Sequence, residues 1–493
     1  MLPPSSSSSP SNFMPNLQSS HLLRRTWLAF NRELSSSVSP FSFKELFDIV
    51  AIGVGSLEDM QTNLERMNIE VTPDLTNRII HSCKTLPPAT NNGCSRSRRL
   101  LRFFTWSLSR SHGSFGDDVF NNAIRAFSAM KDVTAMGIAV SELHNVGSRM
   151  KGDTFALVSE TLVNAGRADE AIQLFRNMME NQKLKLPHGG DDTLGFITTI
   201  VHALCSKGHA RKAEGVVWHH KDKIQQNIGV IHMILLHGWC IYGNAKEAKR
   251  ILREMKSEGI NPGLASYNDL LRCICERNVK FNPSGIISEA ADLMMEMRSS
   301  GIMPTTVSFN ILLSCLSRAR RVQEACRVLS SMMQGEVESS SSSPDQVTYF
   351  IVIRLLYLTK RIVKGNRIFD HMISRRVVVE ARFFHCLIGI LCGIGDVNRA
   401  LAMLNEMKSQ CKGNIGPTYD LLIEKLCRNG NFDEGSRLYD DAIKNGVILQ
   451  ISKDLLDPLK TQVFKPPLRS GKNLTFRKYK SKVLKKTSKK HQK

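Results

Sequence analysis

The sequence predicts an all-α protein, a right-handed α-solenoid of about nine helix–turn–helix repeats of about 35 residues each. Three observations lead to this fold class. Apolar residues recur at i, i+3, i+4 and i+7 in short segments, which is the spacing of one face of an α-helix. These segments occur in pairs separated by short polar turns, and the pairs recur at a nearly constant interval. Because one pair cannot bury both of its apolar faces, the repeats must stack on one another.

Residues 308–333 show one such pair clearly. The first predicted helix has its apolar stripe at Phe309, Leu312, Leu313 and Leu316. After a polar and basic break at 317–321, the second helix has its stripe at Ala325, Val328, Leu329 and Met332. Each helix is about a dozen residues long, the length expected of a short packed helix.

Placing all the pairs in register defines the repeats, which are named below by their first residues. They begin at residues 117, 152, 194, 229, 264, 306, 346, 381 and 416, and the last ends near 450. Most span 35 residues. The extra residues of the longer ones fall in polar stretches such as NVKFNPSG (278–285) and the serine run 339–343. Residues 44–116 are predicted to form a helical lead-in with a partial repeat.

The positive charge of the chain is concentrated at its C-terminal end. The 493 residues carry a net charge of +22. Residues 460–493 contain 13 Lys or Arg and no Asp or Glu. We predict that residues 451–493 form a largely disordered basic tail, and that its lysines can still bind phosphates. The most clustered of these are Lys485, Lys486, Lys489 and Lys490.

The N-terminal residues 1–43 resemble an organelle targeting segment. They are rich in Ser and carry Arg24, Arg25 and Arg32 against one acidic residue, Glu33. This Arg-rich, Ser-rich and acid-poor composition is typical of transit peptides. The arginines before FNRELSSSV (30–38) favour the mitochondrion over the chloroplast as the destination.

Neither the cysteines nor the long uncharged stretch predicts a special site. Five of the 12 cysteines share one position near the end of the first helix of their repeats: Cys205, Cys240, Cys275, Cys392 and Cys427. We interpret that position as a small buried apolar site in a reducing compartment. The uncharged run 225–245 contains Asn, His and Tyr residues and fits the repeat register, so it predicts a core helix rather than a membrane span.

No constellation of residues predicts catalysis or a cofactor. In VAIGVGSLED (50–59), Glu58 stands where the third glycine of a dinucleotide-binding loop would be. His219 and His220 are adjacent and point to different sides of a helix. No zinc-ligand spacing and no zinc-deaminase signature occurs. We therefore expect neither an enzyme nor a bound metal.

The repeats resemble those of the pentatricopeptide repeat family, in its P class of plant organelles. The motifs that carry the resemblance are SYNDLLRCICERN (266–278), VSFNILLSCLSRARRVQEACRVLSSM (307–332), TYDLLIEKLCRNGNFDEGSRLYDDAIKNG (418–446), SEGINPG (257–263) and SSGIMPT (299–305). The resemblance covers residues 117–450 well and 44–116 loosely. The Trp and Leu-Gly-x-x-Tyr signature of the tetratricopeptide repeat is missing.

This resemblance implies binding of single-stranded RNA, with one base for each repeat. In the family, the fifth and last residues of a repeat select the base through hydrogen bonds, and the second residue packs against the base. Asn310 with Asp345 matches the uracil-favouring pair, with Val307 as the packing residue. Asn268 with Thr305 suggests a pyrimidine.

The other repeats depart from the family's pattern. Asn121 and Thr198 are polar at the fifth position, but their closing partners, Lys151 and Ile228, match no base-selecting pair. Apolar fifth residues cannot hydrogen-bond a base edge, and they occur in three repeats: Ala156, Met233 and Phe350. Two further pairs are not standard: His385 with Ile415, and Asp420 with Gln450.

These observations leave three functions open. The first is an organellar RNA-binding solenoid that acts on transcripts in processing, stability, splicing or translation. The second is a structural RNA-binding component of the mitochondrial ribosome, since the basic tail resembles those of ribosomal proteins. The third is a protein-binding helical scaffold. The expected partners are single-stranded organellar RNA, or ribosomal RNA within a ribonucleoprotein complex, and no DNA is expected.

Overall fold

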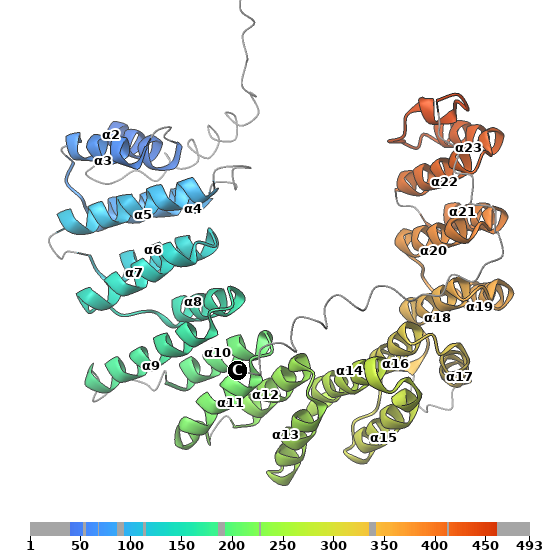
Figure 1. Ribbon diagram of the computed structural model, residues 1–493, viewed down its shortest axis with the longest axis horizontal. Coiled ribbons are helices and arrows are strands. Elements are labelled where there is room, and N and C mark those ends of the chain that lie inside the picture. The colour runs from blue at the N-terminus through green and yellow to red at the C-terminus, as the bar shows by residue number, and fades with distance from the viewer. Residues whose placement is uncertain are drawn as a thin grey trace, which may run out of the picture. The chain divides into compact units, whose positions relative to one another are not determined.

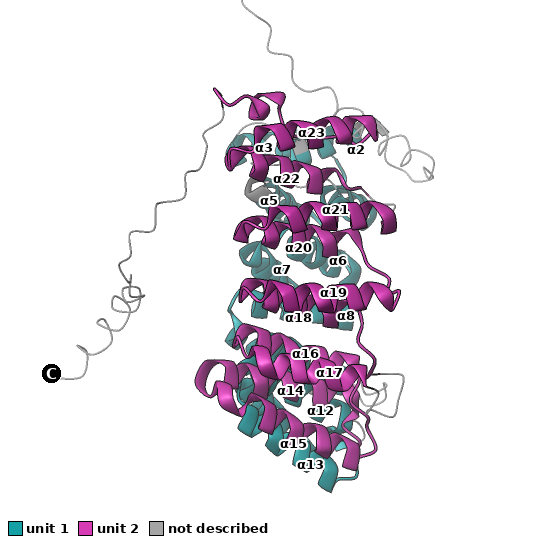
Figure 2. Cartoon of the chain, turned by 90° about the vertical axis from the view of Figure 1, so that its right-hand side faces the viewer, with its two compact units in different colours: residues 1–260 teal, residues 261–493 magenta. Residues whose placement is uncertain are grey.

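The structure is a computed structural model whose regular elements are helices. It describes residues 40–52, 56–67, 69–85, 93–111, 115–185, 193–225, 228–334, 342–411 and 414–460, and every regular element in these ranges is helical (Figure 1). The predicted all-α solenoid is confirmed. The helices fall into two compact units that divide between Ile260 and Asn261 (Figure 2). The predicted targeting segment lies outside the described residues up to position 39, as does the tail from 461 onward.

The first helix of each repeat begins within one residue of the position that the sequence register gives. In unit 1 these helices are α6 (Asp117–Ala129), α8 (Gly152–Asn164), α10 (Thr193–Ser206) and α12 (Ile228–Tyr242). In unit 2 they are α14 (Gly263–Phe281), α16 (Thr306–Arg318), α18 (Gln346–Leu358), α20 (Ala381–Ile394) and α22 (Gly416–Arg428).

Each first helix is followed by a second helix that returns along it. In unit 1 these are α7 (Val133–Val146), α9 (Ala168–Lys185), α11 (Ala210–His219) and α13 (Ala245–Ser257). In unit 2 they are α15 (Ile286–Ser299), α17 (Val322–Met333), α19 (Ile362–Ser374), α21 (Val397–Gln410) and α23 (Phe432–Lys444). Short 3₁₀ turns lie at η3 (Lys221–Lys223), η5 (Pro283–Gly285) and η7 (Lys453–Leu456).

Within each unit, successive first helices pack directly on one another and form an inner layer. In unit 2, α16 packs against α14 on one side and α18 on the other, while α17 packs against its own α16 and the next first helix, α18. Neighbouring second helices are further apart and form an outer layer. The apolar stripes predicted from the sequence are buried in these contacts: Leu313 and Leu316 of α16 are fully buried, as are Leu270 and Leu271 of α14.

The lead-in contains more regular structure than the predicted partial repeat. Its helices are α2 (Pro40–Phe47), the π-helical turn η2 (Asp48–Ile52), α3 (Leu57–Arg66), α4 (Pro73–Thr85) and α5 (Gly93–Arg110). α4 packs on α6 and α5 on α7, while α2 packs on α4 and α3 on α5. The lead-in therefore extends the stack by two helical pairs. The sequence does not show these pairs as repeats, because they do not keep the 35-residue spacing. Only their packing shows that they continue the stack.

The polar stretch 278–285 is partly helical rather than a loop. Residues 278–281 continue α14, and Asn278, which is 2% exposed, donates a hydrogen bond from Nδ2 to the carbonyl oxygen of Gly285 (3.4 Å). This bond ties the helix end to the following 3₁₀ turn. The additional residues of repeat 264 therefore lengthen its first helix by about one turn.

The uncharged run 225–245 forms α12, as predicted, and one face of this helix is turned to the core. Ile231, Leu235, Leu236 and Trp239 are buried. Within the described ranges, no helix is long and apolar enough to span a membrane.

Most repeats share one turn geometry between their helices. The fifteenth residue has a positive φ, and in five repeats it is a glycine: Gly166, Gly208, Gly243, Gly395 and Gly430. Glycine has no Cβ and adopts this left-handed conformation without strain. The next residue often caps the second helix, as Asn244 does when its Oδ1 accepts the N–H groups of Lys246 (3.2 Å) and Glu247 (3.3 Å).

Gly238 lies at a close approach between two first helices in unit 1. A Cβ at this position would lie 2.5 Å from Cys205 Sγ and 3.1 Å from the Cys205 Cα of α10. We predict that Gly238→Ala destabilises the protein by about 1–3 kcal/mol, because α12 must move away from α10. Chemical denaturation followed by circular dichroism measures the change.

The control for this prediction is Gly215→Ala in α11, where an added Cβ meets nothing within 4 Å. It should be neutral or stabilise by up to about 1 kcal/mol, because alanine favours a helix interior over glycine. Equal effects of the two substitutions would contradict the close-packing explanation.

Candidate nucleic-acid interface

Stacking of the first helices brings together the fifth residue of one repeat and the last residue of the same repeat. The last residue lies at the start of the next first helix, which packs on the helix that carries the fifth residue. The third residue of the next repeat is one turn further along that helix. The fifth residue of a repeat thus meets two positions about 30 to 40 residues further along the chain, at one edge of the pair of first helices.

In repeat 306 this meeting point is a polar cluster. Asn310 Nδ2 donates to Asp345 Oδ1 (3.1 Å), and the Thr348 hydroxyl lies 2.7 Å from both Asn310 Oδ1 and Asp345 Oδ1. Asp345 also caps α18, since its Oδ1 accepts the backbone N–H of Thr348 (2.8 Å). All of these contacts use Oδ1, so Asp345 Oδ2 has no hydrogen bond to a described residue. The cluster therefore leaves a carboxylate oxygen and an amide N–H for a ligand.

Val307 lies at the second position of the same helix and is 56% exposed. The equivalent Val230 and Val347 are also exposed. An exposed β-branched residue beside a polar cluster provides a flat apolar contact for a ring. The structure thus places the three predicted residues of repeat 306 on one accessible edge.

Repeat 264 contains the same arrangement with a different hydroxyl. The Ser308 hydroxyl donates to Asn268 Oδ1 (2.7 Å), and it accepts the backbone N–H of Thr305 (3.2 Å). In repeat 381, His385 Nδ1 lies 3.0 Å from the Thr418 hydroxyl. A hydroxyl at the third position therefore orients the fifth residue of the preceding repeat. This role was not predicted from the sequence, although Ser or Thr stands at that position in three repeats (Ser308, Thr348 and Thr418).

Asn121 has a structural role that differs from the predicted one. It is 1% exposed, its Nδ2 donates to the carbonyl oxygens of Asp117 (2.6 Å) and Arg149 (2.9 Å), and its Oδ1 accepts the Lys151 N–H (2.9 Å). Lys151 in turn forms an ion pair with Asp118, which lowers the pKa of that carboxyl group. Because its donors are used and it is buried, Asn121 links two repeats and does not face a ligand.

Thr198 likewise turns toward its own helix, since its hydroxyl donates to the carbonyl oxygen of Leu194 (2.8 Å). No hydrogen bond joins it to Ile228 within the described ranges. Asp420 accepts the backbone N–H groups of Gln450 (3.2 Å) and Ile451 (3.4 Å), so it caps the end of the array. Phe350 contacts the Phe383 ring with a centroid distance of 5.6 Å, and Met233 is partly exposed. These repeats do not offer the polar cluster of repeat 306.

The cysteines of the shared position lie in the core. Cys205, Cys275, Cys392 and Cys427 are buried, and Cys240 is half-buried. Burial raises the pKa of the Cys205 thiol to about 12 and that of Cys392 to about 11. These thiols remain protonated at neutral pH, which does not suit a metal ligand. In the described part of the chain, no cluster of His, Cys, Asp and Glu has the arrangement of a metal site. The four tail lysines lie outside the described residues.

Comparison with known proteins identifies the repeats. The Pentatricopeptide repeat domain matches residues 219–277, and the PPR repeat matches residues 300–333, 161–182, 383–411 and 417–447. A mitochondrial pentatricopeptide repeat-containing protein of Arabidopsis thaliana is 43% identical over 428 residues, which cover 87% of this chain and 84% of that protein. The small ribosomal subunit protein mL104 of the same plant is 30% identical over 399 residues, which cover 80% of this chain and 72% of that protein.

Among solved structures, the chain is similar to the pentatricopeptide repeat protein PPR10 from maize. The TM-score is 0.49 at 18% sequence identity, covering 84% of this chain and 60% of that chain. A structure of PPR10 in complex with an 18-nt psaJ RNA element matches with a TM-score of 0.43, covering 65% of that chain. This chain therefore spans less than two thirds of the length of PPR10.

We predict that Asn121→Ala lowers the free energy of unfolding by about 1–3 kcal/mol, because it leaves buried backbone groups without partners. Thermal or chemical denaturation measures this loss. The matched change Asn310→Ala, at a half-buried site, should cost less. A larger loss of stability for Asn310→Ala than for Asn121→Ala would contradict the structural role given to Asn121.

Proposed function

The chain belongs to the pentatricopeptide repeat family, and from this premise we propose that it is a mitochondrial protein that binds single-stranded RNA and acts in post-transcriptional RNA metabolism. It does so by binding rather than by catalysis. The mitochondrial location expected from residues 1–43 is supported by the relatives, several of which are named as mitochondrial. The observation that carries the proposal is the cluster of Asn310, Asp345 and Thr348 beside the exposed Val307.

The chemistry of this cluster suits a uracil edge. Uracil presents one N–H between two carbonyl oxygens. Asp345 Oδ2 has no hydrogen bond to a described residue and can accept from that N–H, while the second Nδ2 hydrogen of Asn310 can donate to a neighbouring carbonyl. Val307 then packs against the face of the ring. The Thr348 hydroxyl holds both side chains in place before the base arrives, so little rotamer entropy is lost on binding.

The neighbouring repeat 264 extends this site by one base. Asn268 is held by Ser308 in the same manner, and Ser308 also contacts the backbone of Thr305. Two adjacent repeats in unit 2 therefore have oriented fifth residues with closing partners of the predicted kind. Repeats 117 and 194 use their fifth residues internally. We therefore propose a short sequence-selective core rather than a footprint of one base for every repeat.

Replacing both Asn310 and Asp345 by alanine should remove selectivity at one nucleotide, at a cost of about 1–3 kcal/mol for the preferred base. Enrichment of bound sequences from a randomised RNA pool, with parent and variant in parallel, measures the effect. A control is Asn121→Ala, which should leave the enriched motif unchanged. If the double variant enriches the same motif as the parent, repeat 306 does not read a base.

We propose that the tail contributes affinity without sequence preference. Residues 460–493 hold 13 cations and no acids, and each phosphate neutralised on a single strand adds about 0.7 to the salt dependence of binding. If four or five lysines bind, deletion of this segment should lower the slope of log K against log salt by about 3 and leave the preferred sequence unchanged. Titrations between about 50 and 200 mM salt test this. Lys485, Lys486, Lys489 and Lys490 should be neutralised first. Equal slopes would exclude an RNA-binding role of the tail.

A second candidate function is a structural component of the mitochondrial small ribosomal subunit. It is favoured by the 30% identity to mL104 over most of both chains. Few repeats carry a base-selecting pair, and the tail is strongly basic, as suits a protein that binds folded RNA. Sedimentation of mitochondrial extracts decides between the two: stable co-migration with small subunits supports this candidate, while migration with other RNA supports the first.

A further inference from the structure

The outer layer of unit 2 carries cations that the fold leaves uncompensated. The twenty-second position of a repeat lies on the second helix, and it is an arginine in four repeats: Arg250, Arg327, Arg367 and Arg437, the last of which forms an ion pair with Glu434 (3.5 Å). Its surroundings differ between them.

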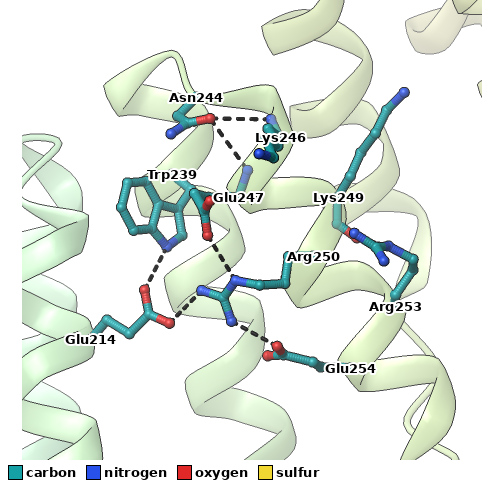
Figure 3. Close-up of polar contacts among 9 residues, drawn as sticks. All are labelled: Glu214, Trp239, Asn244, Lys246, Glu247, Lys249, Arg250, Arg253 and Glu254. Atoms are coloured by element: carbon teal, nitrogen blue, oxygen red, sulfur yellow. Dashed lines mark hydrogen bonds and ion pairs between the residues drawn. The ribbon is translucent and has the colours of Figure 1, made fainter.

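In unit 1, Arg250 is fully neutralised. Its guanidinium donates to Glu247 (2.7 Å) and Glu254 (2.7 Å) of its own helix and to Glu214 of α11, and Trp239 Nε1 also donates to Glu214 (3.2 Å) (Figure 3). Three carboxylates from two neighbouring second helices therefore surround one cation. Such a site leaves no excess positive charge at this arginine.

Most of the equivalent positions in repeats 306 and 346 have no carboxylate. Position 26, which is Glu254 in repeat 229, is Ser331 in repeat 306 and His371 in repeat 346. Position 19, which is Glu247 in repeat 229, is Lys364 in repeat 346. In repeat 306 it remains an acid, but Arg321 already pairs with it. Arg327 and Lys364 accordingly have no ion pair or hydrogen bond to any residue that the structure describes.

Arg327 and Lys364 line the same hollow between α17 and α19. It measures about 490 Å³, and its remaining lining residues are Gln323, Cys326, Ser330, Ser331 and Gln334. Two cations and two amide side chains provide donors there, and no carboxylate lines the hollow. A site with this composition recognises an anion with several acceptor oxygens, as phosphate has.

The turns that lead into α17 and α19 add further cations at positions where folding disfavours them. The fifteenth residue, a glycine in five repeats, is a cation with positive φ in three others: Lys131 in repeat 117 (φ 59°), Arg320 in repeat 306 (φ 57°) and Lys360 in repeat 346 (φ 61°). The helix caps that follow are Arg321 and Arg361, and neither side chain makes a capping hydrogen bond. A left-handed non-glycine and a cation at a helix N-terminus both oppose stability. In repeat 117 the capping Asp132 follows Lys131, whereas repeats 306 and 346 combine both unfavourable features, which points to a role other than stability.

We propose that this outer cationic patch, formed by Arg320, Arg327, Lys360 and Lys364, binds the phosphate backbone of folded RNA. Arg327 and Lys364 are on the second helices, and Arg320 and Lys360 are in the turns that precede these helices, away from the first-helix edge that carries Asn310 and Asp345. Its side chains are long cations and amides without exposed aromatic rings to stack bases, so it recognises backbone rather than sequence. The inference rests on the proposed RNA-binding function and adds to it a second surface, through which the protein holds a helical RNA while a single strand occupies the inner edge.

The test compares two double variants of the full chain on a generic 20-bp RNA duplex. Arg327→Gln with Lys364→Gln removes the two cations of the hollow. Lys246→Gln with Lys249→Gln removes two exposed lysines from α13, beside the neutralised Arg250 (Figure 3), and changes the net charge equally. Circular dichroism confirms that both remain folded, and the charge-conserving Arg327→Lys with Lys364→Arg should retain binding.

The expected result is a several-fold loss of duplex affinity for the first variant alone. Its slope of log K against log salt should fall by up to about 2, since each duplex phosphate contact contributes about 0.9. Equal slopes in both variants would overturn the inference. The inference would also be overturned if the Arg327 and Lys364 variant lost binding to polyglutamate but kept its binding to the duplex. The patch would then be assigned to an acidic protein segment. If Asn310 and Asp345 turn out not to select a base on a single strand, the proposed function fails instead. The two failures can be told apart because that site is separate from the patch.

Discussion

The structure depends on the inability of one helical pair to bury its own apolar faces. A first helix such as α16 has fully buried leucines that no single partner covers, so it requires α14 on one side, α18 on the other and α17 behind it. Stacking supplies these partners at every repeat, and it sets the distance between equivalent residues. Close approaches such as Gly238 to Cys205 show how tightly neighbouring first helices are held.

The candidate interface is a consequence of the same stacking. Because the last residue of a repeat begins the next first helix, its side chain caps that helix and meets the fifth residue of its own repeat. Asp345 performs both tasks through one oxygen and leaves the other for a ligand. Where the geometry uses these positions for internal bonds, as at Asn121, the array gains a link between repeats and loses a contact surface. Stability and recognition therefore compete for the same few positions.

The outer layer shows a similar division between the two units. In unit 1, carboxylates of two second helices surround Arg250 at position 22. Serine, histidine and lysine stand at most of the corresponding acidic positions in repeats 306 and 346, and the remaining acid, Glu324, pairs with Arg321. Because neighbouring second helices contact one another little, such substitutions alter surface charge without disturbing the core. The outer layer of second helices can thus differ in surface charge from repeat to repeat, independently of the inner layer of first helices.

The sequence by itself determined the repeats, their register and the fold class, because helical periodicity is a local property and the same pattern recurs in every repeat. It also identified Asn310, Asp345 and Val307 as neighbours through the resemblance to a known family. It did not reveal the two helical pairs of the lead-in, the bridging hydroxyls of Ser308 and Thr348, or the burial of Asn121. Those features depend on which side chain of one repeat meets which atom of the next. Such contacts join residues about 30 to 40 positions apart, so only the tertiary structure decided them.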